Sequence, residues 1–256
     1  CATYNEEENV REVYRRVKEV FAAEPRYDYE HIFIDNCSTD HTVAILREMA
    51  AADKRVKVIV NARNFGHIRS PSYAILNAQG DAVISLVADL QDPPEMLAGF
   101  LRKWEEGYKV VCAVKKSSEE NGLMFFVRRM YYKFINRLSN VPQIENFTGF
   151  GLYDQSVIKI MRDINDPYPY FRGLIAEIGF PPALIEYDQP ARKFGITKNN
   201  FYTLYDMAIL AITNYSRIPL RLAVFVGFLT GGLSLLIALV YLVYKLKVKV
   251  LVLPRT

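Results

Sequence analysis

The sequence is poor in cysteine and histidine and carries little net charge. Its three cysteines form no Cys-x-x-Cys pair, and no histidine stands at metal-ligand spacing from them, which argues against a zinc site. The odd number of cysteines favours a reduced, cytosolic environment. The net charge of +4 is dispersed, because lysines and arginines alternate with glutamates, and this argues against a nucleic-acid partner.

Two further patterns are absent. No Gly-x-Gly-x-x-Gly follows a predicted strand, which disfavours a nicotinamide-dependent oxidoreductase. No signal peptide opens the sequence, and Cys1 stands directly before a loop, so we expect the first strand of the fold to be missing. The 256 residues suffice for one α/β domain and an appendage.

Short apolar runs rich in β-branched residues alternate with amphipathic segments in the first half of the sequence. The runs predict strands at 30–35, 56–60, 82–88 and 110–114, and the segments predict helices at 9–22, 42–51 and 94–106. Such alternation is typical of an α/β fold with a mostly parallel sheet. Asp40 or Thr42 is expected to cap the second of these helices.

A charge-free run from Leu222 to Tyr244 predicts a membrane-spanning helix. As a helix it would measure about 34 Å, close to the hydrocarbon core of about 30 Å. A buried core helix is the alternative. We place the membrane helix at 219–245 and a basic tail at 246–256, which we expect to be truncated before a second membrane helix. Basic residues flank the run on both sides and so do not orient a single span: Arg217, Arg221, Lys245, Lys247 and Lys249.

Two other segments have amphipathic character. The segment 123–138 follows a polar loop that begins at Lys115, and its apolar residues recur at helical spacing. The segment 201–215 mixes tyrosines with leucine, isoleucine and methionine just before the apolar run. Because aromatic side chains favour the headgroup level, we expect a juxtamembrane interfacial helix at 199–218, with ordinary core packing as the alternative.

The clearest chemical motif runs from Ser85 to Glu95, where a buried-strand pattern ends in acidic and amide groups. Alternate residues that leave a strand point to one side, so oxygens of Asp89 and Gln91 could reach one hard cation. Ligands of open α/β sheets bind beyond the carboxyl ends of the strands, where this motif falls. The alternative is a turn at the end of the strand that leads into a helix beginning with proline. That alternative explains residues 92–95 but not the Asp-x-Gln of Asp89 and Gln91.

A second acidic cluster, Asp35 to Asp40, follows another apolar strand. Two carboxylates in an apolar interior would be costly, so we expect them at the solvated sheet edge. A helix-capping role is the alternative for Asp40.

In this order, several short motifs resemble the membrane-associated family 2 glycosyltransferases, in particular those like dolichol-phosphate mannose synthase and the bacterial polyprenyl-phosphate glycosyltransferases. The resemblance covers nearly the whole chain. It rests on residues 4–9, 35–40, 63–66, 88–95, 146–150, 171–173 and 192–198.

The resemblance implies a GT-A fold, Rossmann-like, over residues 1–198. It also implies a nucleotide-sugar donor, with either uridine or guanosine as the nucleoside, and a magnesium or manganese ion held by Asp89 and Gln91. His67 is the histidine that could approach the donor phosphates. The donor-binding residues it implies are Tyr4, Asn5, Glu6, Asp35, Asn36, Ser38, Asn64, Gly66, Ala88 and Asp89.

The chemistry implied by the resemblance is inverting transfer of a sugar to a polyprenyl phosphate at the cytoplasmic face of the inner membrane. A phosphate acceptor is already anionic, so positioning and charge neutralisation must supply the catalysis. The predicted catalytic residues are Asp89, Gln91, Arg128 and Arg192. The predicted acceptor-phosphate residues are Lys115, Arg128, Arg192 and Lys198, for each of which a solvated surface position is the alternative.

Two positions depart from the family pattern. Val87 stands where relatives often carry the first aspartate of the metal motif, and Gly149 stands where many carry an aspartate. A non-catalytic membrane scaffold, or a transferase with a different acceptor, is therefore kept as an alternative. A processive polysaccharide synthase is disfavoured because the Gln-x-x-Arg-Trp motif is absent. A homo-oligomer remains open.

Overall fold

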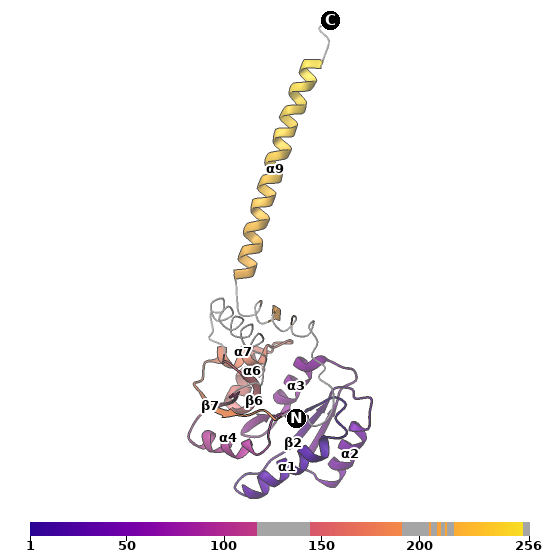
Figure 1. Cartoon of the computed structure of the whole chain (residues 1–256), viewed down its shortest axis with the longest axis vertical. Coiled ribbons are helices and arrows are strands. Elements are labelled where there is room, and N and C mark those ends of the chain that lie inside the picture. Colours follow the sequence, from indigo (N-terminus) through magenta and orange to yellow (C-terminus); the bar gives the residue numbers. More distant parts are fainter. Residues whose placement is uncertain (117–143, 191–204, 206–208, 211–212, 214–217, 253–256) are drawn as a thin grey trace.

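The computed structural model describes residues 1–116, 144–190, 205, 209–210, 213 and 218–252. The described part consists of an α/β domain and a long separate helix (Figure 1).

The first half of the domain is a parallel three-stranded sheet with helical connections. Its strands lie in the order β1-β2-β3. The register pairs Ala2 with Ile34, and Ile34 with Ile59. The elements are β1 (Ala2–Thr3), α1 (Val10–Ala23), β2 (His31–Asp35), α2 (Thr42–Ala52), β3 (Val56–Val60) and α3 (Gly66–Asn77).

The second half is a mixed sheet in the order β4-β6-β5-β7. Strand β6 is antiparallel to both of its neighbours, whereas β5 and β7 are parallel. The elements are β4 (Ala82–Ser85), α4 (Met96–Glu105), β5 (Val110–Lys115), β6 (Phe147–Asp154), α6 (Gln155–Ile164), α7 (Phe171–Ile178) and β7 (Pro182–Tyr187).

A single parallel bridge between Ala2 and Val87 joins the two sheets. Ala2 N donates to Leu86 O, and Ala88 N donates to Ala2 O, each across 3.3 Å. The ends of β1 and of the β4 segment therefore meet at one edge. The expectation that the first strand is missing is wrong, because Ala2 and Thr3 pair with β2 as the strand β1.

Apolar side chains at helical and strand spacing hold these layers together. Val10, Val13 and Val17 of α1 recur at three- and four-residue intervals and are buried. Phe100 and Phe150 meet edge to face with ring centroids 4.9 Å apart. Gly151 lies where β6 crosses β5 so closely that a Cβ would sit 2.2 Å from Val111 O.

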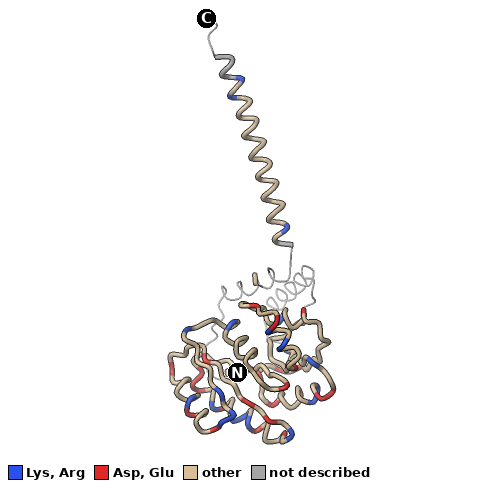
Figure 2. The backbone as a smooth tube through the Cα atoms, turned by 180° about the vertical axis from the view of Figure 1, so that it is seen from behind, with Lys and Arg blue, Asp and Glu red and all other residues tan. Residues whose placement is uncertain are grey.

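Helix α9 (Ile218–Val252) stands apart from the domain. Its segment Leu220–Lys247 has a mean hydropathy of 2.4 and is the one helix in the described part of the chain that is long and apolar enough to cross a membrane. Its most apolar stretch is not buried, which contradicts the alternative of a core helix. Figure 2 shows basic residues only near its two ends, with an uncharged stretch between.

Candidate active site

The loop after β1 is hydrogen-bonded to the loop after β2. Asn5 N donates to Ser38 Oγ across 2.8 Å, and Thr39 N donates to Asn5 Oδ1 across 2.8 Å. Asp35 is fully buried, and its carboxylate accepts hydrogen bonds from Ser38 N and from the Thr3 hydroxyl. Residues predicted to bind the donor are thereby assembled at the carboxyl edge of the sheet.

The side-chain amide of Asn36 connects the same edge to the start of α3. It donates to Asn64 Oδ1 across 2.9 Å and to Gly66 O across 3.2 Å, and its oxygen accepts from Phe65 N across 2.8 Å. Asn64 Oδ1 also accepts from Gly66 N. The predicted donor-binding residues Asn36, Asn64 and Gly66 are therefore in one hydrogen-bonded network, although they follow two different strands.

Asp40 binds the first turn of α2 through its side chain, as expected of a cap, although it does not occupy the N-cap position. The N-cap position of α2 is His41, whose side chain makes no capping hydrogen bond. Asp40 instead accepts from Thr42 N across 3.0 Å and from Glu7 N across 3.3 Å. Burial opposes ionisation of Asp40, but its hydrogen bonds with Thr42 and Glu7 lower its pKa below the usual value. Asp40 thus joins the first two loops as an anion.

Three non-glycine residues of these loops adopt left-handed backbone conformations. They are Asn5 with φ of 54°, Cys37 with φ of 67° and Leu90 with φ of 60°. Each follows a different strand at the shared edge. Such conformations cost about 1–3 kcal/mol each and cluster at functional sites, so this edge is where the fold stores backbone strain.

The loop after β4 carries the predicted metal ligands. Asp89 is 7% exposed, and its Oδ1 accepts from Gln91 N across 3.1 Å, in a turn centred on the strained Leu90. Asp92 is also buried, at 5% exposure. Two carboxylates and one amide thus lie within four residues at the end of a strand.

The pKa of Asp92 is shifted by its surroundings in this loop. Burial and the neighbouring Asp89 carboxylate raise the pKa of Asp92 to about 7, although Tyr187, Lys115 and the backbone of Val87 partly offset this. Tyr187 Oη donates to Asp92 Oδ1 across 3.2 Å, and burial and Asp92 in turn raise the pKa of Tyr187. Two close carboxylates in a low-dielectric site are the environment that a divalent cation relieves.

The oxygen donor set therefore fits a magnesium or manganese ion. No cluster of three or more His, Cys, Asp or Glu side chains suited to a metal occurs in the described part of the chain. Asp89, Asp92 and Gln91 supply two carboxylates and an amide. That is typical of Mg²⁺ sites, which take one or two protein carboxylates together with substrate phosphates and water.

Of the predicted acceptor-phosphate cations, Lys115 lies at the end of β5, where its charge lowers the pKa of Asp92. Arg128, Arg192 and Lys198 lie outside the described residues, as do the segment 123–138 and most of 199–218. Tyr4 and Glu6 lie in the loop after β1, and Ala88 is buried beside the sheet junction.

Residues 2–161 match the sequence profile of glycosyl transferase family 2. This chain belongs to that family. The resemblance drawn from the motifs and the α/β fold with a mostly parallel sheet are confirmed.

Two relatives of this family 2 glycosyltransferase are similar over most of their length. The uncharacterized glycosyltransferase YkcC of Bacillus subtilis (strain 168) is 35% identical over 246 residues, which cover 95% of this chain and 75% of the relative. The bactoprenol glucosyl transferase of Shigella phage SfV is 30% identical over 234 residues, which cover 91% and 76%.

A solved structure is also similar to this family 2 glycosyltransferase. The mannosyltransferase PcManGT from Pyrobaculum calidifontis, in complex with GDP-Man and Mn²⁺, shares 16% identity at a TM-score of 0.48. The match covers 75% of this chain and just over half, 56%, of that chain.

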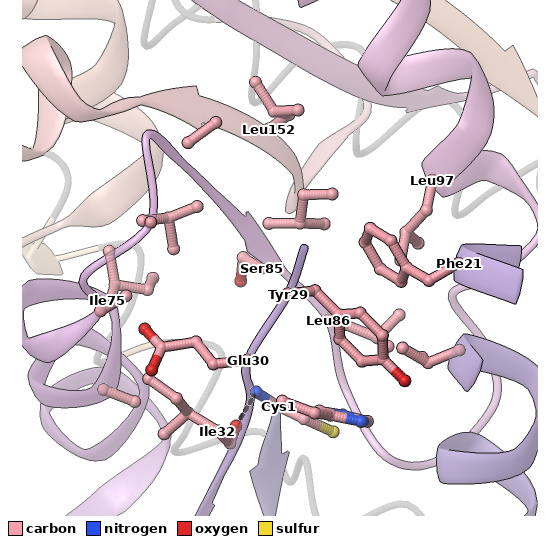
Figure 3. A pocket seen from close by; sticks show the side chains of 18 of the residues that line it. Cys1, Phe21, Tyr29, Glu30, Ile32, Ile75, Ser85, Leu86, Leu97 and Leu152 are labelled. Atoms are coloured by element: carbon pink, nitrogen blue, oxygen red, sulfur yellow. Dashed lines mark hydrogen bonds between the residues drawn. The ribbon is translucent and has the colours of Figure 1, made fainter. Parts of the chain in front are cut away.

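A cavity lies elsewhere, beside the amino ends of β2 and β4 and along β4 as far as Val87 (Figure 3). It has a volume of about 220 Å³ and is lined largely by apolar side chains, among them Phe21, Leu86 and Leu152. Its lining includes Tyr29 and Glu30 before β2. Ligands of open α/β sheets bind at the opposite, carboxyl ends, so we assign no donor site to this cavity.

Several site residues were not among those predicted as ligands. Tyr187 lies 95 residues beyond Asp92, and its hydroxyl contact has no signal in local sequence. Asp92 lies within the Ser85 to Glu95 motif, from which Asp89 and Gln91 were the predicted metal ligands. Arg172 lies in the motif 171–173, one of those on which the resemblance rests, but it was given no role. It donates to Phe147 O across 3.2 Å at the start of β6.

Proposed function

We propose that this family 2 glycosyltransferase transfers a sugar from a nucleotide-diphosphate sugar to a polyprenyl phosphate. One observation carries the proposal: Asp89, Gln91 and Asp92 lie at the end of β4, joined through the Ala2–Val87 bridge to the loops that hold Asn5, Asn36 and Asn64. A nucleotide and its diphosphate would lie across this junction.

The protein's own groups would position the donor and hold its charge. Asn36 and Asn64 fix the loop around the nucleoside, and Asp89, Gln91 and Asp92 would hold a magnesium or manganese ion. Such an ion would supply Lewis-acid neutralisation of the diphosphate leaving group. Lys115, beside Asp92, would add positive charge toward the acceptor phosphate. A phosphate attacks without a strong general base, so aspartate at position 149 is not required.

The lipid acceptor and the membrane location rest on two supports. The phage relative carries the name bactoprenol glucosyl transferase, and bactoprenol is a lipid carrier. Helix α9 is long and apolar enough to hold the domain at a bilayer. We propose that the site faces the cytoplasm at the inner membrane, where the nucleotide sugar and the lipid phosphate meet. A transferase with another acceptor is the second candidate.

The deciding experiment is transfer of radiolabelled sugar from UDP- and GDP-sugars to undecaprenyl phosphate in detergent, with Mg²⁺, Mn²⁺ or chelator. Label in the lipid phase that depends on metal would support the proposal and identify the donor. Hydrolysis of a donor without lipid labelling would favour another acceptor. Folded protein that neither binds nor turns over any donor would favour the non-catalytic scaffold.

A further inference from the structure

The guanidinium of Arg172 lies at the edge of the candidate site. It lies at the second position of α7, where Nη1 donates to Phe147 O across 3.2 Å and the guanidinium carbon lies 5.7 Å from the centroid of the Tyr170 ring. No carboxylate within the described ranges forms an ion pair with it. Its remaining N–H groups therefore have donor capacity for an anion.

A second nitrogenous side chain, that of His67, belongs to helix α3. His67 lies in the first turn of α3 and is exposed. Partial desolvation of the ring and the positive charge of Arg172 both lower the pKa of His67, so the two groups interact electrostatically. The opposite, carboxyl end of α3 is held by Arg162 of α6, which donates to Leu76 O and Ala78 O.

This pair is connected to both halves of the site. Phe147, which accepts from Arg172, precedes Thr148, and Thr148 shares a hydrogen bond with Tyr187, the partner of Asp92. On the other side, Gly66 at the start of α3 accepts from Asn36. A phosphate group bound between the nucleotide loops and the carboxylate loop would therefore lie near Arg172.

We propose that Arg172, with His67, binds a phosphate group of one of the two substrates. The site depends on the proposed function, which it deepens by giving a residue contact for either the donor diphosphate or the lipid phosphate. The guanidinium can hold two phosphate oxygens, and the imidazole can donate to a third. The first turns of α3 and α7 contain no acidic residue, so their N–H groups add to the positive field.

The first test measures binding without catalysis. Pyrophosphate, in the presence of Mg²⁺, is titrated calorimetrically into the full chain in detergent and into Arg172→Gln, Arg172→Lys and His67→Gln. Arg47→Gln, on the exposed surface of α2, is the matched control. We expect Arg172→Gln to raise the dissociation constant for pyrophosphate at least fivefold and His67→Gln to raise it less. Arg172→Lys should bind pyrophosphate more tightly than Arg172→Gln does, and the control should bind it as the parent protein does.

The second test assigns the phosphate. A higher dissociation constant for UDP or GDP with an unchanged KM for the lipid phosphate would assign the donor diphosphate, and the reverse would assign the acceptor. Equal pyrophosphate affinity and equal KM values in the parent and in both Arg172 variants would overturn the site. His67→Gln keeps the test open if Arg172→Gln misfolds. A parent protein that binds pyrophosphate but transfers no sugar would refute the proposed function and not the site.

Discussion

Tyr187 Oη donates a hydrogen bond to Asp92 Oδ1 across 3.2 Å, and this contact joins the last strand of the mixed sheet to the loop after β4. Both side chains are buried. The carboxylate of Asp92 is thus fixed through one of its oxygens. In metal sites, partners that orient a ligand commonly affect metal affinity by about 10–100-fold.

Replacement of this hydroxyl should weaken metal binding. In Tyr187→Phe the ring stays and the hydrogen bond to Asp92 is lost, so we expect the Mn²⁺ dissociation constant to rise roughly tenfold. Electron paramagnetic resonance of free Mn²⁺ during titration measures this directly. Tyr73→Phe, which removes an exposed hydroxyl on α3, should leave the constant unchanged. Equal affinity in Tyr187→Phe and the parent would show that Asp92 is not held for the metal.

Removal of the first carboxylate should abolish turnover. Asp89→Ala loses a buried carboxylate that we propose holds the metal ion, and we expect transfer to fall at least about 10³-fold while the far-ultraviolet circular dichroism is unchanged. The exposed Asp163→Ala on α6 should transfer sugar at the parent rate. An Asp89→Ala enzyme that remains active and dependent on metal would remove Asp89 from the metal site.

The raised pKa of Asp92 predicts a pH dependence of stability in chelator. The unfolded carboxyl ionises near 3.8, whereas the folded one holds its proton to about 7. The contribution of Asp92 to the free energy of unfolding should therefore be largest below about pH 4. It should fall by a few kcal/mol as the pH rises and level off above about pH 7. Urea unfolding between pH 5 and 8 in EDTA tests this.

The matched variant is Asp92→Asn, which keeps the shape and has no charge to gain. Its unfolding free energy should decline less between pH 5 and 8 than that of the parent, and Mn²⁺ at pH 8 should stabilise it less. If the unfolding free energies of the two proteins changed with pH in the same way, the pKa of Asp92 would not be raised in the folded protein.

Close contact between β5 and β6 makes Gly151 a stability determinant. A Cβ there would stand 2.2 Å from Val111 O, so Gly151→Ala must separate two backbone segments. We expect a cost of about 3 kcal/mol, or a fall of roughly 6–12 °C in Tm. Gly99→Ala is the control, because its Cβ meets Ile185 at an ordinary 3.7 Å and lies in α4, where alanine is favoured. A Gly151→Ala protein as stable as Gly99→Ala would contradict the close approach.

The elements that follow local patterns were predictable from sequence, and those that depend on distant pairing were not. The strand expected at 56–60 and the helix expected at 42–51 match β3 and α2 to within one residue. Alternation of strands and helices does not reveal that β6 enters between β4 and β5 in the antiparallel direction. That placement is set by pairing between strands that are far apart in the sequence, which leaves no period in the sequence.

The same division applies to the site. The position of Asp89 and Gln91 beyond the end of a strand was predictable because both directly follow one apolar run, whereas their role as metal ligands stays a prediction. Tyr187 and Arg172 reach the site only through β7 and α7, whose positions depend on tertiary packing. The tight β1–β4 junction at Ala2 and Val87 likewise depends on a single bridge.

The length of α9 has a mechanical consequence. The charge-free run Leu222–Tyr244 within α9 measures about 34 Å as a helix, whereas the hydrocarbon layer of a bilayer is about 30 Å thick. Hydrophobic mismatch of this size is relieved by leaning of the helix, by local thickening of the bilayer or by lysine side chains that extend to the interface. The angle of the helix should therefore change with acyl-chain length, and the chain is expected to favour thicker membranes over thin ones.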